Sequence, residues 1–144
     1  PGFAALGKPS NREGTAILKE GHYKDTWTIG IHGGSPRTKH IAFRQTSGEV
    51  TIYRDKTQDI VYDLDRRRQF TGYFGINIHK GSVGTAVGTR VGNWSEGCQI
   101  FKNGAQQIKV MTLAKKQKDL AGKSTFSYSL IRSTNKVIKE AKLI

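Results

Sequence analysis

Apolar and polar residues alternate in short runs through the first part of the chain. Between residues 15 and 55, four such runs read TAILKE, YKDTWTIGIH, HIAFRQ and EVTIYRD. Gly, Ser, Pro or Asp residues, which favour turns, bound each run. The alternation predicts antiparallel β-strands, and Ser47-Gly48, which joins the last two runs, predicts a hairpin turn between them.

The second part of the chain carries two further strand-like runs. One is GYFGINIHKG, which ends near His79, and the other is TFSYSLIR at residues 125 to 132. Residues 55 to 68 are polar and residues 81 to 93 are rich in Gly, Ser and Thr, so both stretches are predicted to be loops. The tail from residue 136 to residue 144 fits either a short helix or a strand.

One helix is expected, over about residues 104 to 120. In this segment the predicted inward positions recur at spacings of three and four, whereas lysines largely decorate another face. The inward positions are Val110, Leu113, Ala114, Gln117 and Leu120, and the lysines are Lys115, Lys116 and Lys118. Gly122 is well placed to end the helix, because glycine readily adopts the left-handed conformation common at that position.

These elements predict a mainly β fold with one principal α-helix, in which two sheets pack as a sandwich-like pair. The 144 residues suffice for one domain with its own core. Residues 1 to 14 are predicted to be an N-terminal arm or linker, and residues 15 to 144 a single catalytic domain. No apolar run approaches the roughly 18 residues that span a bilayer, and no charged-then-apolar secretory leader stands at the start.

The chain is strongly basic, with a formal net charge of +13. Residues 105 to 144 hold nine Lys or Arg residues against Asp119 and Glu140, a net charge of +7. Such a charge favours contact with polyanions, which include nucleic acid, anionic lipid and bacterial wall polymers. A solubilising surface explains the same charge, so charge narrows the set of partners without choosing one.

Because Cys98 is the single cysteine, an intramolecular disulfide is excluded. Whether it is a nucleophile depends on the residues around it. Gly97 precedes it and allows a tight turn beside the sulfur, so main-chain N–H groups can point at a developing oxyanion. A lone cysteine can equally be a buried structural thiol. A nucleophile also needs a base, and histidine titrates nearest to neutrality.

His79 is the favoured base among the four histidines. It ends a strand-like run 19 residues before Cys98, and a Gly-rich loop separates the two. The hexapeptide around His32, IGIHGG, echoes INIHKG around His79, which makes His32 a second candidate for a role in the site. His22 and His40 are interpreted as surface or structural residues.

No metal or other cofactor is expected. The aspartates Asp55, Asp59, Asp63 and Asp65 lack the glycine and the closing glutamate of a calcium-binding EF-hand loop. The three arginines beside them indicate local charge balance instead. The chain also contains no His-Glu-x-x-His or Cys-x-x-Cys cluster of the kind that binds zinc.

A strand ending in Ile-His-x-Gly, a Gly-rich loop, then Ser-x-Gly-Cys and a helix resembles the catalytic core of the L,D-transpeptidases. The resemblance covers about residues 72 to 120, close to a third of the chain. It implies that His79 is the base and Cys98 the nucleophile. It also implies that the carbonyl of Lys80 orients the imidazole, that Gly97 and Cys98 shape the oxyanion hole, and that Ser95 braces the loop.

Several neighbours are candidate substrate contacts. Trp94 either stacks on substrate or anchors the core, and Asn77 shares a sheet face with His79, where it either bonds near the site or faces solvent. His32 and Gln99 complete the set. The family commonly continues from the cysteine with an aliphatic residue and arginine, whereas Gln99 and Ile100 follow here, a departure that concerns substrate recognition.

The expected function is a peptidoglycan-active cysteine enzyme that acts on stem peptides through a thioacyl intermediate, as an L,D-carboxypeptidase or L,D-transpeptidase. It would act at the bacterial cell wall, in the periplasm, outside the cell or delivered by a virion. One alternative is a phage-type or toxin-type lysin that cuts another stem-peptide bond with the same dyad. An alternative of another class is a basic β-rich module that binds nucleic acid or another polyanion through its aromatic and cationic residues. No helix-turn-helix, zinc-finger or RNA-recognition signature supports nucleic acid.

Overall fold

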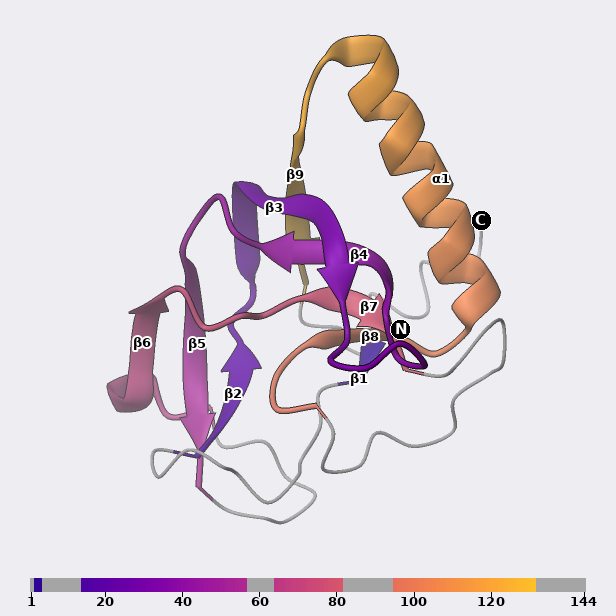
Figure 1. The fold of residues 1–144 in the computed structure, drawn as a ribbon. Helices are drawn as coiled ribbons and strands as arrows, with labels where there is room; N and C mark the ends of the chain where they lie inside the picture. The colour runs from indigo at the N-terminus through magenta and orange to yellow at the C-terminus, as the bar shows by residue number, and fades with distance from the viewer. Residues whose placement is uncertain (1, 4–13, 57–63, 82–94, 132–144) are drawn as a thin grey trace, which may run out of the picture.

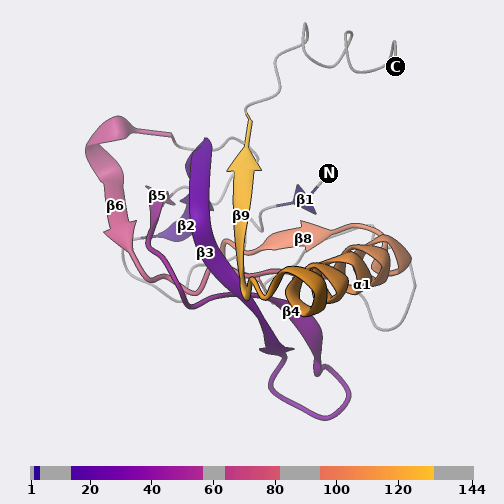
Figure 2. The ribbon, with the colours of Figure 1, turned by 90° about the horizontal axis from the view of Figure 1, so that it is seen from above.

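A computed structural model describes residues 2–3, 14–56, 64–81 and 95–131 (Figures 1 and 2). These residues form a mainly β fold with one principal α-helix, as the hydrophobic pattern predicts. The strands are β1 (Gly2–Phe3), β2 (Thr15–Leu18), β3 (Gly21–His32), β4 (His40–Gln45), β5 (Val50–Asp55), β6 (Gln69–Gly72), β7 (Ile78–Lys80), β8 (Gln99–Phe101) and β9 (Thr125–Leu130). A 3-10 turn (Arg66–Arg68) precedes β6, and the helix α1 spans Gly104–Ala121.

The strands form two sheets. The large sheet has six strands in the order β1-β8-β7-β4-β3-β9, and the small sheet has three in the order β2-β5-β6. All pairs are antiparallel except β7 and β8, which run parallel. Within the segment predicted to be an arm, β1 pairs with β8, the strand that follows the cysteine.

The predicted hairpin at Ser47-Gly48 is wrong. The strands on either side of it, β4 and β5, lie in different sheets, because β3 and β7 already occupy both edges of β4. The turn therefore carries the chain from the large sheet to the small one. It is fastened to β3, since the Ser47 N–H donates to the Thr26 carbonyl at 3.1 Å.

The polar stretch before residue 72 contains more structure than a loop. Asp65 begins the 3-10 turn, where its carboxylate accepts from the Arg67 N–H at 2.9 Å and pairs with the Arg67 guanidinium at 3.0 Å. The strand β6 follows directly and pairs with the edge of β5. The strand predicted over residues 72 to 81 is shorter in the structure and spans Ile78–Lys80. In the described part of the chain, residues 73 to 76 are held by hydrogen bonds to side chains and not by main-chain hydrogen bonds to a neighbouring strand.

The helix has the predicted length, but its predicted buried face is only partly right. Ala114 is buried and Val110 packs against the core, as predicted, whereas Gln117 is exposed and Leu113 and Leu120 are 65% and 88% exposed. The buried positions are Gly104, Gln107, Met111 and Ala114. The helix packs on β7 and β8 near its start, and its last turns extend beyond these strands (Figure 1). Asn103 caps the first turn, and Gly122 ends the helix at a φ of +62°, as expected.

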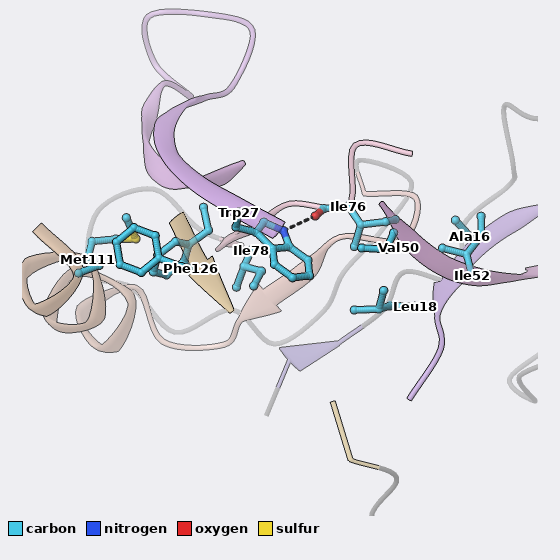
Figure 3. Close-up of a cluster of buried hydrophobic side chains, with 11 residues drawn as sticks. Ala16, Leu18, Trp27, Val50, Ile52, Ile76, Ile78, Met111 and Phe126 are labelled. Carbon is cyan, nitrogen blue, oxygen red and sulfur yellow. Dashed lines mark hydrogen bonds between the residues drawn. The ribbon is translucent and has the colours of Figure 1, made fainter. Parts of the chain in front are cut away.

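A continuous hydrophobic core connects the helix to both sheets (Figure 3). Trp27 lies at its centre, is 1% exposed and donates from its indole N–H to the Ile76 carbonyl at 2.7 Å. Phe126 and Met111 lie on the helix side, and Val50 and Ile52 on the side of the small sheet. The described residues contain no helix both long enough and apolar enough to cross a membrane.

Because side chains alternate along a strand, the register divides the large sheet into two faces. We call the side that carries the core and the helix the apolar face; its residues are Trp27, Ile29, Phe43, Ile78 and Phe126. We call the other side the polar face; its residues are Thr28, Gly30, His32, His40, Ala42, Arg44, Asn77, His79, Cys98 and Ile100. The second set contains the nucleophile and base expected from the sequence.

Candidate active site

Gln45, at the end of β4, holds the segment that leads into β7. Its amide N–H groups donate to the carbonyls of Gly48 and Gly72 at 3.1 and 3.0 Å. Its amide oxygen accepts from the N–H groups of Phe74 and Ile76 at 3.1 and 2.9 Å. This buried side chain therefore replaces a strand ladder over residues 72 to 76 and sets the path of the chain toward His79.

Asn77 connects three strands on the polar face. Its side-chain oxygen accepts from the Arg44 Nε at 3.2 Å and from the Gln45 N–H at 3.1 Å, both on β4. Its side-chain nitrogen lies 3.4 Å from the His32 Nδ1 on β3. Its main-chain carbonyl accepts from the Gln99 N–H at 2.8 Å, at the start of β8. The residue is buried and occupies the centre of the site.

His79 is 4% exposed, and its Nδ1 lies 2.8 Å from the Lys80 carbonyl oxygen. This is the contact that the resemblance implies. A carbonyl oxygen only accepts hydrogen bonds, so Nδ1 carries the proton of the neutral ring and the lone pair is on Nε2. The imidazole is thus held in the tautomer that can accept a proton from a thiol.

The parallel register places Cys98 near His79. Ile78 lies opposite Gln99, and His79 lies opposite Ile100. Cys98 precedes Ile100 by two residues, so it is a diagonal neighbour of His79 on the same face. With strands about 4.8 Å apart and a rise of about 3.3 Å per residue, the two Cα atoms are about 8 Å apart. That separation allows a cysteine and a histidine side chain to approach each other.

Gly97 is required by the turn before the thiol. Its φ of +123° lies where side chains are strained. A Cβ at this position would also meet the Ala16 carbonyl oxygen at 2.5 Å and the Ile76 Cδ1 at 3.1 Å. The glycine thus lets the loop before Cys98 press against β2 and the segment that Gln45 holds. The Cys98 Sγ lies 3.6 Å from the Gly75 carbonyl oxygen in that segment.

Burial raises the pKa of the Cys98 thiol above its usual value. The main chain and side chain of Asn77, the Ser95 hydroxyl and the Arg44 charge oppose this effect. Ser95 is buried beside the thiol, yet its Oγ makes no hydrogen bond of standard geometry with any residue that the structure describes. The resting thiol is therefore protonated at neutral pH, and its contact with the Gly75 carbonyl oxygen favours the same form.

Burial also lowers the pKa of His79, to about 4, and the charges of His32, His40 and Arg44 act in the same direction. The hydrogen bond to Lys80 opposes the shift. The rings of His32 and His79 stack with their centroids 4.0 Å apart. At neutral pH the base is consequently unprotonated, so the pair rests as a thiol and a neutral imidazole.

His32 and His40 complete a group of three histidines. Their centroids are 5.4 Å apart, and burial lowers the pKa of His32. The His40 Nδ1 lies 2.7 Å from the Thr38 carbonyl, while its buried Nε2 has no hydrogen-bond partner among the described residues. Because the rings of His32 and His79 stack face to face, their nitrogens do not converge on one point. No group of three or more His, Cys, Asp or Glu residues in the described ranges is arranged to hold a metal ion.

The structure places Cys98, His79, Asn77 and His32 on one face of the large sheet, with the Lys80 carbonyl bound to the His79 ring and Ser95 and Gly97 beside Cys98. Gln99 lies opposite Ile78, so its side chain belongs to the other face of the sheet and is not brought to the thiol. Trp94 lies outside the described residues.

Two residues of the site were missed, Arg44 and Gln45. The alternation in HIAFRQ puts Arg44 on the side opposite Phe43, and this polar position was the available signal. No sequence pattern connects either residue with Asn77, because the contacts cross more than 30 positions of the chain.

Comparison of the chain with models of known protein families, with curated proteins and with solved structures finds no match. The resemblance to the L,D-transpeptidases therefore depends on the sequence motifs alone.

Proposed function

We propose that this protein is a peptidoglycan-active cysteine enzyme that acts on stem peptides through a thioacyl intermediate. The observation that carries the proposal is the contact between the His79 Nδ1 and the Lys80 carbonyl oxygen. This contact assigns the ring proton to Nδ1 and leaves the lone pair on Nε2, in a ring on the face that holds Cys98. A thiol and an oriented neutral imidazole on one rigid sheet are the elements of nucleophilic acyl transfer.

In the proposed first step, the Cys98 Sγ attacks the carbonyl carbon of the amide before a terminal D-residue. The His79 Nε2 takes the thiol proton as the S–C bond forms, since both groups are neutral at rest. The turn at Gly97 presents main-chain N–H groups toward the negative charge that develops on the carbonyl oxygen. The imidazolium then gives its proton to the leaving amine, the C–N bond breaks, and a thioester remains.

In the second step, either water or the amine of another stem peptide attacks the thioester carbon. The His79 Nε2 takes a proton from this nucleophile and returns it to the Cys98 sulfur as the S–C bond breaks. Water yields a shortened peptide, and an amine yields a cross-link. The low pKa of His79 keeps the base unprotonated over the whole neutral range in both steps.

The test is mass analysis of muropeptides after purified peptidoglycan is incubated with the wild type, with Cys98→Ala or with His79→Gln. We expect the wild type to remove a terminal D-residue or to form new cross-links, and both variants to lose at least about 1,000-fold in rate. Circular dichroism checks that the variants remain folded. The product mass also reveals whether another stem-peptide bond is cut, as in a lysin. If peptidoglycans of several chemotypes stay unchanged with the wild type, the proposal fails.

A further inference from the structure

Arg44 occupies the same row of the polar face as the nucleophile. The antiparallel register that pairs Phe43 with Ile78 sets Arg44 opposite Asn77, and the parallel register sets Asn77 beside Cys98. Each step across a sheet is about 4.8 Å, so the Cα atoms of Arg44 and Cys98 are about 10 Å apart with Asn77 between them. The two side chains therefore flank a single position on the sheet surface.

The guanidinium group of Arg44 is held in place by the protein. Its Nε donates to the Asn77 side-chain oxygen at 3.2 Å, and one terminal nitrogen donates to the Ile31 carbonyl at 2.5 Å. Gly30 makes room for the stem, since a Cβ there would lie 3.0 Å from the Arg44 Cγ. An arginine fixed in this way loses little conformational entropy when it binds a ligand.

This cation has no carboxylate partner among the residues that the structure describes. A guanidinium has five N–H donors, and the two bonds to Asn77 and Ile31 leave the second terminal nitrogen without a described acceptor. Among the residues that the structure describes, Arg44 is the charged one whose field lowers the pKa of the Cys98 thiol. A positioned, half-buried arginine with unused donors is a good binding group for a carboxylate.

We propose that Arg44 binds the free α-carboxylate of the terminal residue that Cys98 releases, so that the enzyme acts at the end of the stem peptide and not within it. This inference rests on the proposed function and names the feature of the substrate that the site selects. Three bonds separate the scissile carbonyl carbon from that carboxylate carbon, a span of at most about 4 Å. The separation of about 10 Å between the two Cα atoms leaves room for this span between the two side chains.

The experiment measures kcat/KM on two synthetic stem tetrapeptides that differ only at the C-terminus. One ends in D-alanine as the free acid, and the other ends in D-alanine amide, which is neutral. We expect the wild type to prefer the acid by about 100-fold, because the amide lacks the charge that the guanidinium binds. Arg44→Gln should lose the preference, so that it cuts acid and amide at similar rates. Arg44→Lys, which keeps the charge without the planar fork, should fall between the two.

Arg67→Gln is the matched control, since it removes the same charge from an exposed arginine that pairs with Asp65 in the 3-10 turn. It should keep the wild-type preference. Circular dichroism checks that Arg44→Gln is folded. If the wild type cuts acid and amide equally, or if Arg44→Gln keeps the wild-type preference for the acid, the carboxylate role is wrong. If the wild type cuts neither peptide and leaves peptidoglycan unchanged, the proposed function itself has failed.

Discussion

The two faces of the large sheet share the same strands and backbone but use their residues differently. The apolar face packs Trp27, Phe43 and Phe126 under the helix in a core without charged groups. The polar face holds Arg44, Asn77 and His79 through hydrogen bonds and ring stacking. Burial on one face adds to stability, and burial on the other keeps a thiol and an imidazole in their neutral forms.

The contrast teaches where the sheet can tolerate change. Substitutions on the apolar face should lower the free energy of unfolding by removing packed volume. Substitutions on the polar face should alter pH dependence and reactivity, because its groups were buried together with their hydrogen-bond partners.

The largest effect on stability should come from Trp27→Ala. The indole is almost fully buried, contacts Tyr23 and Tyr128 edge to face, and donates to the Ile76 carbonyl. We expect a loss of about 3–5 kcal/mol in the free energy of unfolding, measured by urea titration. Trp27→Phe retains much of the ring and should lose less. An equal loss in both variants would mean that the indole hydrogen bond, not the packed volume, dominates at this position.

Lowering the pH should reduce the free energy of unfolding through His79 on the polar face. Between the pKa of about 4 for His79 and its ordinary value near 6.5, the unfolded chain binds more protons than the folded one. Stability should therefore fall as the pH drops through this window, by on the order of 3 kcal/mol from His79. Below the folded pKa this contribution should change no further.

The measurement is urea unfolding at several pH values between 7.5 and 4, with wild type and His79→Gln compared. The difference between the two curves isolates His79, because His32, whose pKa is also lowered, contributes to both. Parallel curves across the window would show that His79 has a normal pKa and would remove the neutral resting pair from the mechanism.

Gly97→Ala should disturb the turn before Cys98, where that turn packs against β2. The added Cβ meets the Ala16 carbonyl, and the residue is strained at its φ of +123°. We expect a loss of about 1–3 kcal/mol in stability and a larger relative loss of activity, because the strain acts on the loop that places the thiol. Gly34→Ala is a suitable control, since a Cβ there meets no atom within 4 Å. Unchanged activity in Gly97→Ala would mean that the turn does not position Cys98.

The smallest effect should come from Leu120→Gln. This leucine is 88% exposed on the last turn of α1, beyond the strands that the helix covers. We expect a change within about 0.5 kcal/mol in the free energy of unfolding. Met111→Gln, at a buried position of the same helix, should cost several times more. Similar losses in the free energy of unfolding for the two variants would mean that Leu120 is buried, as the sequence spacing predicted.

Much of the fold was predictable because it depends on local patterns. Strands β2 to β5 and β9 follow the alternation of apolar and polar residues, and Gly122 ends the helix as its position suggests. The errors have a common cause. The hairpin at Ser47-Gly48, the face of α1 and the strand β6 all depend on which surfaces meet in three dimensions.

The candidate site divides in the same way. Spacing and motif sufficed to select Cys98, His79, Gly97 and the Lys80 carbonyl, because these residues are close in sequence or belong to one motif. The partners that tune them, above all Arg44 and Gln45, come from β4, more than 30 residues earlier.

The amino-acid sequence alone determined that this chain forms strands and one helix and that a cysteine and a histidine are its best candidates for chemistry. Only the tertiary structure decided which residues surround them. Strand order and register set the neighbours of Asn77, burial set the direction of each pKa shift, and the row through Arg44, Asn77 and Cys98 exists only in the folded sheet. The physical reason is that local propensity acts over a few residues, whereas burial and electrostatics act through space.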